Sequence, residues 1–510
     1  MLGLLDWVRA RYVSPLATVI ERSHPPRVAG EESPVDAAAS PGGPLEHLHT
    51  ARPGVTTWLR PLPGEEATAC VEGIRTCSAS GKQAILLVPQ AEPLPATARA
   101  VLDAFGDRAV SFLGGDARAR YRAWLDIRSG AYDVVVATRP GVFAPLGALG
   151  LIWISREVHP GHREDRAPYY HVREVAMARA RLEGAACVLA SLSPSVETAA
   201  AIEQGAVGVS RPARSSERAA APLVETTPPE GEDRSARLAS LLKGARSAAL
   251  VVSRRGYGVA RVCRTCGEPA KCARCGGPIV SERGAASCRV CAARGACANC
   301  GGVSFGIERG GAERVAQWAG HIAAVPVQLD TGDGGDPPGA GSVLVGTAAT
   351  VKDIGAVHLD LVAILDPDRA LARPGVHAAE QSLATWMEAA AWAGPRAAGG
   401  RVLVQTRKAG HPAIQALVRW EPLPYLSAEG AQRSEAGFPP GHPVYRLAGR
   451  GDLAGALRAA GAHTVLSTSA ESGTLCLVAV PPDRLDGFRR EVLKLVAEGD
   501  VERVEAEPQL

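Results

Sequence analysis

Four pairs of cysteines, each pair separated by two residues, constrain the fold of this chain more than any other feature. The pairs are Cys263 and Cys266, Cys272 and Cys275, Cys288 and Cys291, and Cys297 and Cys300. A two-residue gap lets both sulfurs of a tight turn, or knuckle, bind one metal ion, and two knuckles complete a tetrahedral site. The sequence therefore predicts a module at 263–300 that holds two zinc ions, each through four thiolates.

The spacing of the cysteines indicates how the knuckles combine. The gaps within and between the pairs are 2, 5, 2, 12, 2, 5 and 2 residues, the same in both directions. This symmetry favours nested pairing, in which the outer knuckles share one ion and the inner knuckles share the other. Nested pairing assigns the first zinc to Cys263, Cys266, Cys297 and Cys300, and the second to Cys272, Cys275, Cys288 and Cys291. The alternative is sequential pairing, in which neighbouring knuckles share an ion.

The remaining cysteines and the N-terminus indicate the compartment. Cys70, Cys77, Cys187 and Cys476 have no partner at such a spacing and are predicted to be buried small apolar residues. The first residues, MLGLLDWVRARYV, lack the long apolar run and the cleavage site of a signal peptide. Without an export route, the twelve cysteines favour metal over disulfides. There is also no uninterrupted apolar run of about 18 residues. We therefore expect a cytoplasmic protein with no membrane partner.

The net charge does not identify a partner. The formal charge of the chain is +3, and eight thiolates with two divalent ions contribute −4, which brings it to −1. A balance this small neither indicates nor excludes nucleic-acid binding.

Short apolar runs that alternate with helical stretches predict two parallel sheets. The runs of the first sheet are 84–89, 133–138, 149–155 and 187–193, and those of the second are 248–253, 342–347, 361–366 and 401–406. Continuous apolar strands are buried on both faces, so helices should cover both sides of each sheet. The cysteine module interrupts the second sheet after its first strand. From about 442 onward, the order strand, helix, strand, strand, helix, strand is ferredoxin-like.

The predicted fold class is therefore α/β, with a C-terminal α+β domain. Segments rich in proline and polar residues predict linkers at 28–51 and 208–235. The other predicted units are a first lobe at 52–207, a second lobe at 236–262 and 301–410, the metal module at 263–300, and a C-terminal domain at 411–510.

Several stretches of the sequence resemble the PriA family of replication-restart DNA helicases. They are 81–89 (GKQAILLVP), 137–152, 167–185, 191–197 (SLSPSVE), 253–267, 342–353 and 400–419. The resemblance implies two RecA-like helicase lobes, with the cysteine module as a zinc-binding region inserted in the second lobe. Residues 1–27 resemble only the end of the family's N-terminal DNA-binding part, and we expect a remnant of that part there.

The first ATP-handling motif of the family is altered in this chain. In place of a phosphate loop it has Arg60-Pro-Leu-Pro-Gly-Glu-Glu-Ala67. The two prolines lack amide donors, and Glu65 and Glu66 would repel phosphate. Ser80-Gly81-Lys82-Gln83 does not replace the loop, because its earlier glycine and its hydroxyl are missing and it precedes a strand.

Three further motifs differ as well. The family's DEEH motif is replaced by Ser155, Arg156, Glu157 and Val158, so both acids that act on magnesium and water are absent. In the stretch 388–395, Trp392 and Pro395 replace the arginine fingers. In the TKGHDF-like motif Lys352 survives, but the next three positions are Asp353, Ile354 and Gly355. We therefore expect no catalytic residue, no nucleotide-binding residue, no ATP cofactor, and neither ATPase nor helicase activity.

The resemblance implies a protein that binds abandoned or stalled replication forks and promotes primosome assembly and reloading of the replicative helicase. Implied partners are branched or forked DNA, the single-strand DNA-binding protein, and the primosome and helicase-loading proteins. Candidate DNA contacts are Arg139, Arg173, Arg254 and Arg255, each of which could instead be a solvated or ion-paired surface arginine. The alternatives are a zinc-stabilised protein-interaction scaffold without a DNA role, and an active ATP-dependent 3′–5′ DNA helicase with a divergent site.

Overall fold

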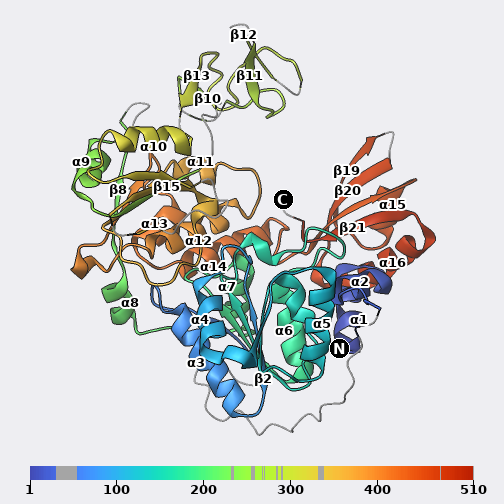
Figure 1. Ribbon diagram of the computed structural model, residues 1–510. Coiled ribbons are helices and arrows are strands. Elements are labelled where there is room, and N and C mark those ends of the chain that lie inside the picture. Colours follow the sequence, from blue (N-terminus) through green and yellow to red (C-terminus); the bar gives the residue numbers. More distant parts are fainter. Residues whose placement is uncertain are drawn as a thin grey trace.

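The computed structural model describes residues 1–29, 31, 54–230, 235–253 and 259–508, apart from short gaps at 267, 269, 283–284, 289–290, 310, 331–337, 340 and 471–472. Two parallel sheets, a cysteine-rich module and a C-terminal antiparallel sheet make up these residues (Figure 1). The predicted α/β fold class with a C-terminal α+β domain is confirmed. In this part of the chain, no helix has the length and apolar character needed to cross a membrane.

The first sheet has seven parallel strands in the order β3-β4-β2-β5-β6-β1-β7. They are β1 (Thr56–Leu59), β2 (Gln83–Leu87), β3 (Ala109–Phe112), β4 (Val134–Ala137), β5 (Leu149–Ser155), β6 (Ala186–Ala190) and β7 (Gly208–Ser210). α3 (Glu66–Ala79) and α4 (Ala96–Phe105) pack on one face, and α5 (Ala117–Arg128) and α6 (Val172–Glu183) pack on the other. α7 (Val196–Glu203) follows β6. We call this sheet with its helices the first lobe.

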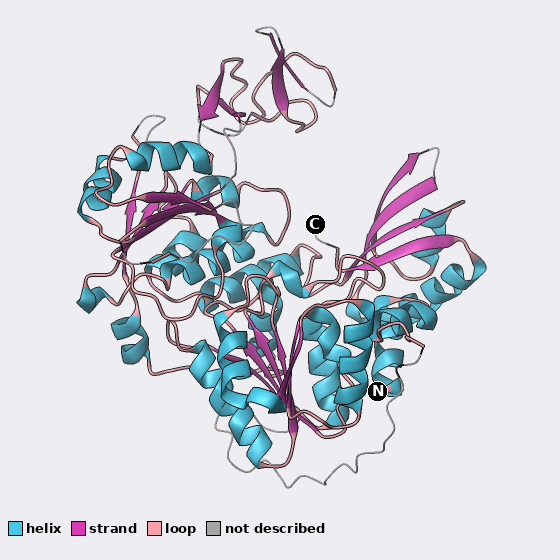
Figure 2. Ribbon diagram, viewed as in Figure 1, coloured by secondary structure: helices cyan, strands magenta, loops and turns pink. Residues whose placement is uncertain are grey.

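The second sheet has six parallel strands in the order β14-β15-β9-β16-β17-β8. They are β8 (Leu223–Thr227), β9 (Ala248–Val252), β14 (Val327–Leu329), β15 (Val343–Thr347), β16 (Leu361–Leu365) and β17 (Arg401–Gln405). α9 (Ala236–Gly244) and α10 (Ala312–Gly320) cover one face, while α11 (Pro367–Leu371), α12 (Ala378–Ala390) and α13 (Pro412–Val418) cover the other. Figure 2 shows helices on both faces of each parallel sheet, which explains why the central strands are almost entirely apolar. We call this sheet with its helices the second lobe.

The cysteine-rich module projects from the second lobe, on the side away from the first (Figure 1). It consists of two antiparallel strand pairs, β10 (Val259–Cys263) with β13 (Phe305–Arg309), and β11 (Ile279–Glu282) with β12 (Ala285–Cys288). The module is inserted in the sequence after β9, as predicted. However, β9 is the second strand of its sheet along the chain, because β8 precedes it.

The C-terminal sheet has the strand order β19-β20-β18-β21, and every neighbouring pair is antiparallel. Its elements are β18 (Val444–Gly449), α15 (Leu453–Ala459), β19 (Thr464–Ala470), β20 (Gly473–Ala479), α16 (Leu485–Glu498) and β21 (Val501–Ala506), while the preceding α14 (Leu423–Glu435) packs against α7 of the first lobe. The strand and helix order from β18 onward is the predicted ferredoxin-like one. α1 (Leu2–Tyr12) joins the core of this sheet to that of the first lobe, and α2 (Leu16–Ser23) follows it.

Two predicted boundaries need correction. The segment 208–235 is not simply a linker, because it supplies β7 to the first sheet, α8 (Arg214–Ala220), and β8 to the second sheet. Both strands lie at sheet edges, where one side is solvated, and they contain polar residues. They therefore do not form the apolar runs by which strands were predicted. The predicted C-terminal domain also begins too early, because Ile414 and Leu417 of α13 are buried in the core of the second lobe.

Candidate functional site

The eight cysteines of the module form two groups of four, and the grouping is the nested one. Within each group, the four Sγ atoms lie within 4.8 Å of one another. In the outer group, Sγ–Sγ distances are 3.5 Å for Cys263 and Cys300 and 3.7 Å for Cys266 and Cys297. In the inner group they are 3.8 Å for Cys272 and Cys291 and 3.4 Å for Cys275 and Cys288.

These distances fit a tetrahedral metal site. Four sulfurs at a bond length of about 2.3 Å from a central ion lie roughly 3.8 Å apart, close to the separations observed. Four thiolates are also a donor set that suits zinc and other thiophilic ions. Each group of cysteines could therefore hold one metal ion.

All four knuckles share one backbone pattern. The first cysteine of each donates its amide to the carbonyl oxygen five residues later, over 2.8 or 2.9 Å. In the three knuckles where the residue before that acceptor is described, its φ is positive: +70° at Gly276, +72° at Gly301 and +55° at Ala292. Glycine adopts this conformation easily, and the glycines were visible in the sequence. Ala292 was not recognised as their equivalent, because it is not a glycine.

The four remaining cysteines, Cys70, Cys77, Cys187 and Cys476, are all buried, as predicted. They lie in the apolar cores of the first lobe and the C-terminal sheet.

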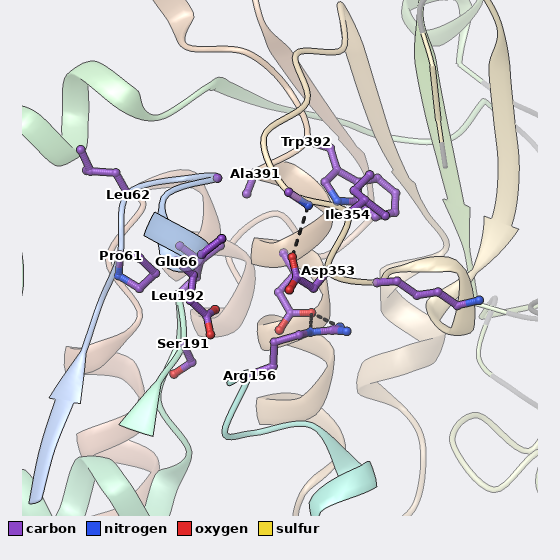
Figure 3. Close-up of a pocket in the computed structure, with 15 residues that line it drawn as sticks. Pro61, Leu62, Glu66, Arg156, Ser191, Leu192, Asp353, Ile354, Ala391 and Trp392 are labelled. Atoms are coloured by element: carbon purple, nitrogen blue, oxygen red, sulfur yellow. Dashed lines mark hydrogen bonds and ion pairs between the residues drawn. The ribbon is translucent and has the colours of Figure 1, made fainter. Parts of the chain in front are cut away.

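A cleft lies between the two lobes where the altered ATP motifs meet. Figure 3 shows Pro61, Leu62 and Glu66 of the first lobe facing Asp353, Ile354 and Trp392 of the second. The segment 60–65 connects β1 to α3, the strand-to-helix position of a phosphate loop. The space that remains measures about 80 Å³, well below the roughly 300–1,000 Å³ of typical ligand pockets.

The first residue of this loop, Arg60, points away from the cleft. Its side chain is only 1% exposed. It donates to the carbonyl oxygens of Leu192 and Trp420, each at 3.1 Å, and pairs with Glu217 at 3.2 Å. Arg60 therefore fixes the loop to the protein interior instead of binding an anion.

Arg156 occupies the second position of the former DEEH motif and is 6% exposed. Its Nε donates to Glu388 Oε2 at 2.9 Å, and its Nη2 donates to the same oxygen and to the Val351 carbonyl oxygen at 2.9 Å. Trp392, at the first arginine-finger position, is buried in the core of the second lobe. Both substituted positions are thus filled by groups that bond or pack within the protein.

The surviving acid, Glu157, is also structural. It is completely buried, its Oε1 accepts a hydrogen bond from the Ser195 amide at 2.7 Å, and its Oε2 accepts one from Arg173 at 3.2 Å. Burial raises the pKa of Glu157. A carboxyl group so enclosed has no access to a substrate in the cleft.

Glu66 changes the electrostatic argument made from the sequence. Burial, followed by the nearby Asp353 carboxylate, raises the pKa of Glu66 to about 8. The side chain is therefore mostly neutral at pH 7 and would not repel phosphate as a carboxylate would. At this position the repulsion expected from the sequence is therefore weakened, whereas Pro61 and Pro63 still offer no amide donor to a phosphate group.

The candidate DNA contacts differ in their burial and in their partners within the protein. Arg173 is 5% exposed and pairs with Glu157 and Glu197, so it belongs to the interior, which corrects its predicted role. Arg139 is half-buried, donates to the Gly161 carbonyl oxygen at 3.0 Å and lies 3.7 Å from Glu164. Arg254 and Arg255 lie outside the described residues.

Comparison with known proteins finds replication restart proteins named PriA as relatives of this chain. No family model matches the chain. The chain is 32% identical over 487 residues to the probable replication restart protein PriA of Mycobacterium leprae, which covers 86% of this chain and 74% of that protein. It is 30% identical over 396 residues to the replication restart protein PriA of Treponema pallidum, covering 71% and 59%. Among solved structures, RecG bound to a three-way DNA junction matches with a TM-score of 0.41 and 11% identity, over 74% of this chain and 44% of that chain.

Proposed function

Since the chain belongs to the PriA family of replication restart proteins, we propose that it acts in the cytoplasm at abandoned or stalled replication forks without hydrolysing ATP. It binds branched DNA there and promotes primosome assembly and reloading of the replicative helicase. Its protein partners are then the single-strand DNA-binding protein and the helicase-loading proteins. The proposed lack of ATP hydrolysis rests on the cleft between the lobes. This cleft is about 80 Å³ in volume, and the Arg156–Glu388 ion pair crosses it.

We expect no ATP hydrolysis, with or without forked DNA, and no ATP binding in the micromolar range by calorimetry. Pro61 and Pro63 offer no amide hydrogen to a phosphate group. A nucleotide would also have to displace the buried Arg156–Glu388 pair, and removing a partner from such a pair leaves an uncompensated charge. Micromolar ATP binding, or turnover that fork DNA stimulates, would contradict this part of the proposal.

We propose that the metal in both cysteine clusters is zinc and that the module carries the DNA-binding surface. Four-thiolate sites with this spacing are characteristic of structural zinc. The cationic side chains exposed on the described part of the module are Arg264, Lys271, Arg274 and Arg294. Arginine and lysine contact phosphate oxygens without reading base sequence, so the binding should depend on DNA structure and charge.

We expect forked DNA to bind with an affinity that falls steeply with salt, because each phosphate contact releases counterions. Changing Arg264, Arg274 and Arg294 together to alanine should flatten the slope of log affinity against log salt by up to about 3 units. Fluorescence anisotropy of a labelled fork across salt concentrations measures this slope.

The matched control changes Arg75, Arg99 and Arg490, which are exposed on the first lobe and the C-terminal domain, to alanine. This variant removes the same charge and should leave the slope nearly unchanged. If the two triple variants weaken binding equally, the module is not the DNA surface. If the unmodified protein does not bind forks at low salt, the chain is a protein scaffold without a DNA role.

A further inference from the structure

We propose that the two lobes are clasped in one closed arrangement by their own side chains, with no nucleotide needed to hold them. This goes beyond the proposed function, which concerns what the chain binds. The clasp consists of Arg156 on the first lobe and of Asp353, Glu380 and Glu388 on the second. Arg156 and Asp353 stand at altered positions of the ATP motifs, and Glu388 begins the stretch 388–395, in which the arginine fingers are replaced.

The first contact of the clasp crosses the cleft. Arg156 follows the end of β5 in the first lobe, whereas Glu388 lies on α12 and Val351 follows β15 in the second. One guanidinium group therefore bonds both a helix side chain and a backbone carbonyl of the opposite lobe. Because Arg156 is almost fully buried, removing either partner would leave a poorly solvated charge, which is strongly unfavourable.

The second contact caps a helix of the first lobe from the second lobe. The N-cap residue of α4 is Pro95, whose side chain accepts no hydrogen bond from the helix. Asp353 accepts in its place: its Oδ2 bonds the Thr97 amide at 2.8 Å, and its carbonyl oxygen bonds the Ala96 amide at 3.0 Å. A carboxylate at a helix N-terminus satisfies unpaired amides and interacts favourably with the helix dipole.

The third contact repeats this arrangement at α7. Glu380 of α12 is 3% exposed, and its Oε2 accepts a hydrogen bond from the Val196 amide at the start of α7 at 3.0 Å. The same oxygen lies 3.4 Å from Arg433 of α14, and Oε1 lies 2.5 Å from His377. Glu380 is therefore held from several directions.

Together these contacts reach three separate elements of the first lobe, the end of β5 and the N-termini of α4 and α7. A single contact would permit rotation about it, whereas three contacts to different elements fix both distance and orientation. In an ATP-driven motor, the nucleotide has to change the arrangement of the lobes in each cycle. Here side chains of the protein itself hold the two lobes together. Binding or loss of a nucleotide would therefore not change how the lobes are arranged.

The test measures the separation of the lobes in the full chain without DNA, so its result does not depend on the DNA-binding proposal. A fluorescent pair is attached through unnatural amino acids at Arg75 on α3 and Lys243 on α9, both exposed. We expect one narrow distance distribution, unchanged by Mg-ATP. Two or more distances without nucleotide, or narrowing on addition of Mg-ATP, would overturn the proposal.

Variants of the clasp give the second part of the test. Arg156→Glu places a second negative charge beside Glu388 and should broaden the distance distribution. Combining it with Glu388→Arg should restore most of the narrow distribution. The control Lys494→Ala removes an exposed ion pair within α16 and should have no effect. Asp353→Ala should speed hydrogen exchange in the peptide that carries the Thr97 amide at least about tenfold. This measurement tests the clasp even if the Arg156→Glu variant fails to fold. Unchanged exchange in Asp353→Ala, or an unchanged distance in a folded Arg156→Glu variant, would contradict the clasp.

Discussion

Removal of the metal ions by a chelator is expected to unfold residues 259–309 while both parallel sheets remain folded. The described part of the module has very little apolar core: the buried residues that cluster in it are Ala270, Cys272, Ile279 and Cys288, and two of them are cysteines of the four-sulfur groups. A segment of this size cannot stabilise itself by burial alone, whereas structural zinc supplies roughly 10–16 kcal/mol. Among the described residues, the cores of the two lobes contain none of the eight clustered cysteines. Their folding should therefore not depend on metal.

Elemental analysis and hydrogen exchange test this expectation. The purified protein should contain two zinc ions per chain, and exchange should rise in the module alone after chelation. A content of one ion or none, or an unchanged exchange rate in the module after both ions are removed, would contradict it.

Serine substitutions test which sulfurs share an ion. Cys263→Ser and Cys300→Ser should each release the same ion, and the double variant should release no more, because the two sulfurs lie 3.5 Å apart in one cluster. Adding Cys272→Ser should release the second ion. Cys476→Ser, at a buried cysteine of the C-terminal sheet, should retain both. Loss of the same ion from Cys263→Ser and Cys275→Ser would instead indicate sequential pairing.

The sequence predicts well those features that depend on local spacing. A two-residue gap between cysteines determines the shape of a knuckle whatever surrounds it, so the spacing alone indicates the ligands and favours their nested order. The central strands of both sheets are equally predictable, because a strand buried on both faces must be apolar throughout. β4, β5, β9 and β16 all lie within predicted apolar runs.

The features that depend on distant partners are not predictable in this way. Arg156 and Glu388 lie 232 positions apart, and nothing in either neighbourhood indicates the other. In the sequence, Asp353 is recognisable only as a residue that replaces a glycine of the family motif. Its role as a cap of α4 is visible only in the structure, where α4 lies beside it. β7 and β8 were missed for a different reason, since edge strands with one solvated side carry polar residues. Substituted motif positions are therefore visible in the sequence, but the interactions that the new residues make are not.

Glu66→Gln is expected to stabilise the protein at pH 8 and to leave its stability nearly unchanged at pH 4.5. The folded chain holds the Glu66 proton up to a pKa of about 8, whereas an unfolded carboxyl group releases it near 4.5. The native state thus binds more protons than the unfolded state between these values, and stability falls as the pH rises through this window. At about 1.36 kcal/mol per pKa unit, the loss by pH 8 is on the order of 4 kcal/mol.

Glutamine has nearly the shape of a protonated glutamic acid and does not titrate, so it removes this loss. Urea unfolding at a series of pH values should show the variant more stable than the unmodified protein by on the order of 2–4 kcal/mol at pH 8. Glu65→Gln is the matched control, because Glu65 is the neighbouring carboxyl group and is exposed. It should leave the pH dependence unchanged. Parallel stability curves for Glu66→Gln and the unmodified protein would mean that Glu66 is ionised in the folded state. In that case the predicted repulsion of phosphate by this residue would stand after all.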